Sequence, residues 1–159
     1  MEFVWSPWRY DYMASMGKKP TSCVFCVTKD TSGDAERLIV FRGAHNFVIL
    51  NLFPYTSGHL MVAPYAHLAD PQDGPPEQMA EMMELAKRAM RALRKLYQPE
   101  GFNMGMNIGH AAGAGVREHF HLHVVPRWFG DSNFMTSVGE TRVLPEDLSV
   151  TLRRLSEVF

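Results

Sequence analysis

The chain has 159 residues, of which 46% are hydrophobic and 21% charged, and these are ordinary values for a globular protein. Its length suits a single domain that spans residues 1–159 and can bury a core. The formal net charge of -1 argues against nucleic acid or a membrane surface as a partner, because both attract positively charged proteins. We find no secretory signal pattern and no apolar run long enough to span a bilayer, so we expect a cytoplasmic protein.

The first half of the chain is expected to form a short helix, a loop and three strands. Ser6 followed by Pro7 is typical of a helix start, and this helix should run to about Ser15. Residues 17–36 are rich in loop-forming residues and contain the sequence Cys-Val-Phe-Cys at 23–26. Three strands are then predicted, at Leu38–Phe41, Phe47–Leu52 and His59–Ala63.

The second half begins with the clearest helix pattern. Apolar residues recur every three or four positions from about Pro76 to Tyr97. Strands are expected at Phe102–Ile108 and Glu118–Val125, on either side of a glycine-rich link. A stripe of leucines behind two acidic residues predicts a C-terminal helix from about Pro145. Short connections favour an antiparallel sheet with one main helix packed against it, which is an α+β fold.

Three histidines stand out near the end of the predicted sheet. His119, His121 and His123 alternate with apolar residues, and alternate residues of a strand share one face. The three imidazoles should therefore lie in a row, about 6.6 Å apart, opposite the core side. Three ordinary surface histidines are one interpretation. A metal platform and catalysis by a histidine nucleophile are the two functional alternatives.

A glycine-rich segment, Gly-His-Ala-Ala-Gly-Ala-Gly, lies directly upstream at 109–115. Gly113 and Gly115 allow the backbone to turn tightly and to direct N–H groups at an anion. The segment lacks the lysine and the following helix of a Walker loop. A flexible link between strands is the alternative, but the neighbouring histidines favour a phosphate-binding role.

The motif His-Phe-His-Leu-His-Val-Val at 119–125 resembles the signature of the histidine triad family of nucleotide hydrolases and transferases. Residues 47–67 and 101–119 resemble the family's nucleotide pocket and the strand and loop that lead into the triad. The opening at 5–9 and residues 123–135 are similar to a bacterial branch that includes diadenosine tetraphosphate phosphorylases. The resemblance implies a five-stranded antiparallel sheet with one long helix and a C-terminal helix. It also implies a homodimer with a joined ten-stranded sheet.

The resemblance gives each histidine of the site a role. His121 would attack the α-phosphorus of a nucleotide substrate and carry the nucleotidyl group, since a neutral imidazole with a pKa of about 6.5 is a good nucleophile at neutral pH. His123 would bind phosphate oxygens near the leaving group. His119 is the first member of the triad, and His59 matches a further histidine that supports it.

Four other positions are implied to contact the nucleotide. Asn51 matches a residue that binds the ribose hydroxyls, and Asn107 matches one that approaches the phosphates. Gly113 and Gly115 would contribute backbone N–H groups. Many members of the family carry Ser or Thr where this chain has Gly115, so a hydroxyl contact to the α-phosphate is missing and backbone N–H groups would have to replace it.

The spacing of Cys23 and Cys26 suggests metal or redox chemistry in a reducing compartment. The resemblance supplies His67 and His119 as two further ligands. Together they would form a closed tetrahedral Cys2His2 site, which is typical of structural zinc. The alternative is a pair of small buried cysteines. No organic cofactor is expected.

The function implied is cleavage of a dinucleoside polyphosphate such as diadenosine tetraphosphate, with water or inorganic phosphate as the acceptor. Adenosine phosphoramidase activity is an alternative within the same chemistry. Two other classes remain: a nucleotide-binding sensor with little turnover, and a zinc-dependent hydrolase that uses the histidines as metal ligands.

Overall fold

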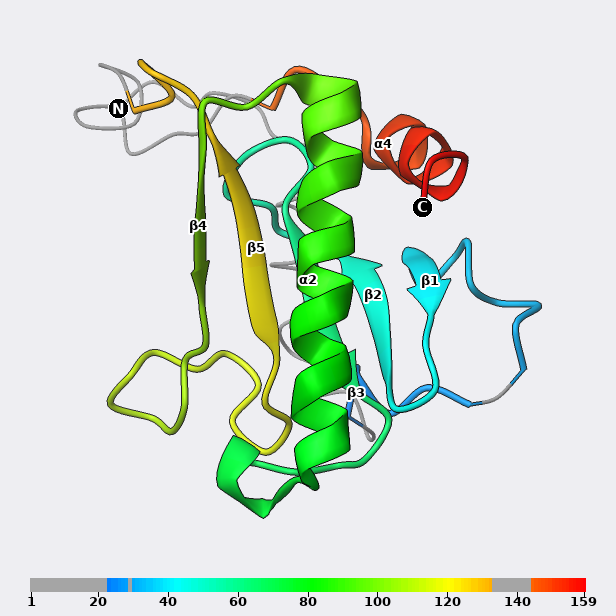
Figure 1. Ribbon diagram of the computed structural model, residues 1–159, viewed down its shortest axis with the longest axis vertical. Helices are drawn as coiled ribbons and strands as arrows, with labels where there is room; N and C mark the ends of the chain where they lie inside the picture. The colour runs from blue at the N-terminus through cyan, green and yellow to red at the C-terminus, as the bar shows by residue number, and fades with distance from the viewer. Residues whose placement is uncertain (1–22, 29, 133–143) are drawn as a thin grey trace, which may run out of the picture.

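The computed structural model describes residues 23–28, 30–132 and 144–159 (Figure 1). The helix predicted from Ser6 to Ser15, the opening motif at 5–9 and part of the segment 123–135 lie outside the described residues. In the part of the chain that is described, no helix is both long and apolar enough to cross a membrane.

A five-stranded antiparallel sheet forms the centre of the molecule, as predicted (Figure 1). Its strands, in chain order, are β1 (Ile39–Arg42), β2 (Asn46–Leu50), β3 (Leu60–Pro64), β4 (Gly101–Gly105) and β5 (Leu122–Arg127). Their order in the sheet is β1-β2-β3-β5-β4, so β5 lies inside the sheet and β4 forms one edge. The strand that carries His123 is therefore paired on both sides.

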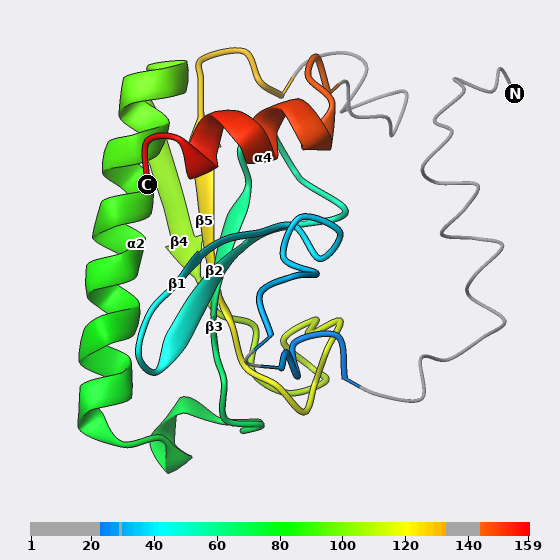
Figure 2. The same ribbon diagram turned by 90° about the vertical axis from the view of Figure 1, so that its right-hand side faces the viewer.

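One face of the sheet is covered by α2 (Pro76–Tyr97). A short 3-10 helix, η1 (Pro71–Asp73), precedes it, and Gln98 ends it in a left-handed conformation. The C-terminal helix α4 (Leu148–Ser156) begins at the N-cap Asp147 and crosses the end of the sheet beside the C-terminal end of α2 (Figure 2). The helix predicted from about Pro145 thus begins three residues later.

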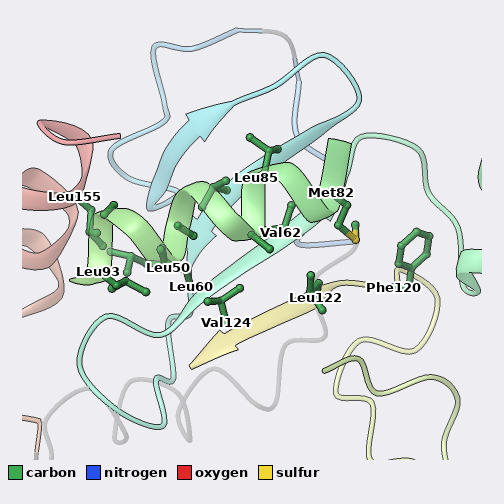
Figure 3. Packing of buried hydrophobic residues seen from close by; sticks show 14 residues of the cluster. Leu50, Leu60, Val62, Met82, Leu85, Leu93, Phe120, Leu122, Val124 and Leu155 are labelled. Atoms are coloured by element: carbon green, nitrogen blue, oxygen red, sulfur yellow. The ribbon is translucent and has the colours of Figure 1, made fainter. Parts of the chain in front are cut away.

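The main core lies between α2 and the sheet (Figure 3). Leu122 and Val124 of β5 point into it together with Phe120, which confirms the predicted alternation. Met82 is buried there, whereas the adjacent Met83 is 46% exposed and lies outside the apolar stripe of α2.

Strands β4 and β5 are both shorter than predicted. Extending the pairing of Val62 with Leu122 would place Pro64 opposite Phe120, but a proline has no N–H to donate to a ladder. The N–H of Phe120 instead donates to the carbonyl oxygen of Leu68 at 2.8 Å. Only the last histidine of the triad, His123, therefore lies in β5, because β5 begins at Leu122 rather than at Glu118.

Candidate active site and metal site

The rings of His121 and His123 lie next to each other, edge to face, with centroids 4.8 Å apart. His119 turns away from them toward Cys23 and Cys26. Both His119 and His121 are buried, because the second face of the sheet is covered by the loop that contains Phe25. The three histidines therefore do not form one exposed row, and they divide into a pair and a single ring.

His121 is held in one tautomer by the backbone. Its Nδ1 lies 3.0 Å from the carbonyl oxygen of His119, which can only accept, so Nδ1 carries the proton. The lone pair is then on Nε2. Burial lowers the pKa of His121, although the bond to His119 opposes this effect. The result is a neutral imidazole with one nitrogen ready to attack an electrophile.

His123 is oriented by His59 in the same way. The backbone N–H of Tyr55 donates to His59 Nδ1 at 3.1 Å, so the proton of His59 is on Nε2. This Nε2 donates to His123 Nδ1 at 2.9 Å, which leaves the proton of His123 on its own Nε2. Burial, with a smaller effect of His121, lowers the pKa of His123 to about 4. His123 is therefore a neutral hydrogen-bond donor.

A pocket of about 820 Å³ opens beside His123, and Asn107 also lines it. His121 adjoins this pocket through the ring of His123. Asn51 lies on the other side of His59, with its Nδ2 3.4 Å from His59 Nδ1, and its Oδ1 accepts from the N–H of Phe53. Asn107 thus shares the pocket with His123, whereas Asn51 contacts His59 and is not among the residues that line this pocket.

The glycine-rich segment forms a turn. Gly113 has a φ of 79°, which favours glycine, and its N–H donates to the carbonyl oxygen of His110 at 3.0 Å. At Gly115 a Cβ would meet no atom of the described residues within 4 Å. Many members of the family that this sequence resembles carry Ser or Thr at the position of Gly115. The structure has room for a side chain there.

Cys23, Cys26, His67 and His119 form a four-residue cluster whose ligand atoms all lie within 4.8 Å of one another. Three of these contacts measure 3.2–3.8 Å, close to the ligand separations of about 3.4–3.8 Å in a tetrahedral zinc site. The Nε2 of His119 donates to the carbonyl oxygen of Pro64 at 2.8 Å, which leaves Nδ1 free to bind metal. The donor set and its geometry fit a closed zinc site.

Comparison with known proteins decides the family. A model of the HIT domain matches residues 32–130. This chain belongs to the HIT family, the histidine triad family of nucleotide hydrolases and transferases. The AP-4-A phosphorylase of Mycobacterium tuberculosis is 39% identical over 162 aligned residues, which cover 98% of this chain and 83% of the relative.

Solved structures agree with this assignment. A zinc-bound histidine triad family protein from Mycobacterium smegmatis is 37% identical and superposes with a TM-score of 0.68, over 86% of this chain and 92% of that one. A HIT family protein from Bacillus anthracis is 28% identical with a TM-score of 0.58, over 69% and 76% of the two chains. The predicted fold and the family are both confirmed, and a Cys/His cluster compatible with structural zinc is present.

Sequence reasoning missed Phe25 as a residue of this HIT site. Its ring is 4% exposed and packs against His121 with centroids 4.6 Å apart, and against His119 at 5.5 Å. An aromatic residue between two cysteines has no pattern that predicts this contact. Phe25 thus connects the metal cluster to the ring of His121.

Arg127 was also missed. It lines the pocket at the far end of β5 from His123, where its guanidinium binds Asp131 and Asn103. The alternation of β5 places Arg127 on the face of His123, which was the available signal.

Proposed function

We propose that this HIT protein cleaves dinucleoside polyphosphates, such as diadenosine tetraphosphate, by nucleotidyl transfer through His121. The observation that carries the proposal is the fixed tautomer of His121, because the carbonyl of His119 holds the proton on Nδ1 and leaves the lone pair on Nε2. The relative that is named AP-4-A phosphorylase supports this substrate class.

In the first step the Nε2 lone pair of His121 would attack the α-phosphorus. An N–P bond forms while the bond from that phosphorus to the bridging oxygen breaks, and the departing nucleoside polyphosphate keeps the electron pair. The N–H on Nε2 of His123 would donate to a phosphate oxygen at the leaving side. Because burial keeps His123 neutral, it stabilises the developing charge as a donor rather than as a cation.

In the second step water or inorganic phosphate attacks the same phosphorus, and the N–P bond breaks. The electron pair returns to Nε2 of His121, which restores the free enzyme. Water would release AMP and phosphate would release ADP, while the first step releases ATP from diadenosine tetraphosphate in both cases. Asn51 would bind the ribose, and Asn107 and the backbone N–H of Gly115 would contact the phosphates. The N–H of Gly113, which we expected to do the same, already donates to the carbonyl oxygen of His110.

The zinc would have a structural role. Cys23, Cys26, His67 and His119 would hold it, and four protein ligands leave no position for a catalytic water. His121 and His123 are not part of this cluster, which favours a histidine nucleophile over a zinc-dependent hydrolase. The zinc would supply rigidity by tying the loop of Cys23 to the sheet.

We also propose a homodimer and a single HIT domain over residues 1–159. Strand β4 forms an edge of the sheet with half-buried and exposed residues, so its backbone groups are available for pairing with a second copy. Such pairing would give the ten-stranded sheet that the family resemblance implies.

The proposal is tested by the products formed from diadenosine tetraphosphate, with and without inorganic phosphate, by the protein and by its His121→Asn variant. ADP and ATP that appear only with phosphate indicate a phosphorylase, and AMP and ATP in both conditions indicate a hydrolase. The variant should form neither. If the unmodified protein does not turn this substrate over, the proposed substrate class is wrong, and adenosine 5′-phosphoramidate is the next compound to assay.

A further inference from the structure

The pocket beside His123 continues as a groove well beyond the histidines. His123, Val125 and Arg127 alternate along β5 and share one face. On the neighbouring strand β4, Asn103 pairs with Val125 and Gly105 with His123, and both β4 residues also line the pocket. Arg127 lies about 13 Å from His123 along the strand. The volume of about 820 Å³ is at the upper end of the range for small-molecule sites, about 300–1,000 Å³, so the groove has room for more than one phosphate.

The far end of the groove contains two arginines, and each is matched by a carboxylate. Arg127 donates from Nε and Nη2 to Asp131 at 2.6 and 2.8 Å, and Arg154 is paired with Glu146. Positive and negative charges therefore balance among the described residues that line this end. A balanced pair offers little net attraction to an anion, so this end is poorly suited to a terminal phosphate.

Aromatic and polar side chains complete this end. The indole Nε1 of Trp128 points to the carbonyl oxygen of Tyr97 in a long hydrogen bond of 3.4 Å. Both residues line the pocket, together with the amide of Asn103. A base can stack on a flat aromatic ring, and a base and a ribose can form hydrogen bonds with nearby donors and acceptors.

We propose that this distal pocket, formed by Asn103, Arg127, Trp128 and Tyr97, binds the second nucleoside, the one that leaves with the polyphosphate. The inference rests on the proposed attack by His121. With the α-phosphate at His121 and His123, the remaining phosphates lie along β5 and the second nucleoside reaches the neutral end. The groove thus selects dinucleoside polyphosphates over nucleotides that end in a phosphate.

The test compares diadenosine tetraphosphate with adenosine 5′-tetraphosphate, which gives the same nucleotidyl enzyme but lacks the second nucleoside. The unmodified protein should have the higher kcat/KM for the dinucleotide. Trp128→Leu should lower that kcat/KM by about 10- to 100-fold, the range expected for the loss of one stacked base. The kcat/KM for adenosine 5′-tetraphosphate should stay unchanged.

Asn103→Ala provides a second variant at an exposed position of β4, where misfolding is not expected, and it should reduce the same preference. Phe129→Leu is the matched control, because Phe129 adjoins Trp128 in sequence but is 90% exposed and does not line the pocket. If Trp128→Leu lost kcat/KM equally for both substrates, or if the unmodified protein did not prefer the dinucleotide, the proposal that the distal pocket binds the second nucleoside would be overturned. A protein that turns over neither substrate would instead overturn the proposed function.

Discussion

Replacing His59 with leucine tests how the site holds the proton of His123. His59 is fully buried and donates to His123 Nδ1 at 2.9 Å, while it accepts from the N–H of Tyr55. His59→Leu removes this donor and replaces the imidazole with an apolar side chain of similar volume. The proton of His123 can then move to Nδ1, and its Nε2 no longer presents a fixed donor to the leaving group.

The magnitude follows from the loss of one preorganised donor. Removing a donor that acts on developing charge costs about 10²–10³ in rate, which corresponds to about 3–4 kcal/mol of transition-state stabilisation. Because His123 still donates during part of the time, we expect the lower value, about 10² in kcat. The loss of the hydrogen bond from the N–H of Tyr55 to His59 should also lower the free energy of unfolding by about 0.5–1.5 kcal/mol.

The assay separates the donor role from a general loss of structure. Aryl esters of AMP with phenols of different acidity would be compared at a temperature where circular dichroism shows the variant fully folded. The loss of rate should grow as the leaving oxygen becomes more basic, because such an oxygen depends more on a donor. His45→Leu, an exposed histidine outside the site, should match the unmodified protein. An equal loss across all esters would show that His59 does not act through the hydrogen bond that His123 donates to the leaving oxygen.

Three further predictions concern the support of the site. Glu81→Gln should lower the free energy of unfolding by about 2 kcal/mol at pH 7, since the carboxylate accepts four hydrogen bonds, from Ala44, His45 and Asn46. Burial raises the pKa of Glu81, but these hydrogen bonds outweigh it and the pKa is lowered. In urea titrations the difference in free energy of unfolding between the unmodified protein and the variant should therefore be lost as the pH falls below about 4. Cys26→Ser should reduce bound zinc, measured by plasma mass spectrometry, and an unchanged zinc content would exclude Cys26 as a ligand. Phe25→Leu should lower kcat about 10-fold with zinc retained, because small displacements of a nucleophile are costly. An unchanged kcat would contradict a role of Phe25 in positioning His121.

The sequence predicted those parts of the fold in which side-chain periodicity and pairing agree. The apolar period predicted the helix α2, and the prolines at its start together with Pro99 after its end predicted its bounds. The alternation around His121 predicted which residues enter the core, because Phe120 and Leu122 are apolar in the required register. Resemblance to the HIT family then supplied the partners of Cys23 and Cys26, which lie far away in the chain.

Other features depend on contacts that no local pattern encodes. The start of β5 is set by Pro64 on a neighbouring strand, so the run of alternating residues alone placed it too early. The tautomers of His121 and His123 depend on a carbonyl oxygen and on the backbone of Tyr55. Phe25 meets His121 only because the cysteine loop folds across the second face of the sheet.

The proposed mechanism requires that His121 carry the nucleotidyl group. This is tested most directly by rapid-quench mass spectrometry of the protein mixed with diadenosine tetraphosphate in the absence of inorganic phosphate, followed by peptide mapping. One AMP should be bonded to the peptide that contains His121, formed together with one equivalent of ATP, and this adduct should be absent in His121→Asn. Turnover by His121→Asn at the rate of the unmodified protein, or an adduct on another residue, would contradict it.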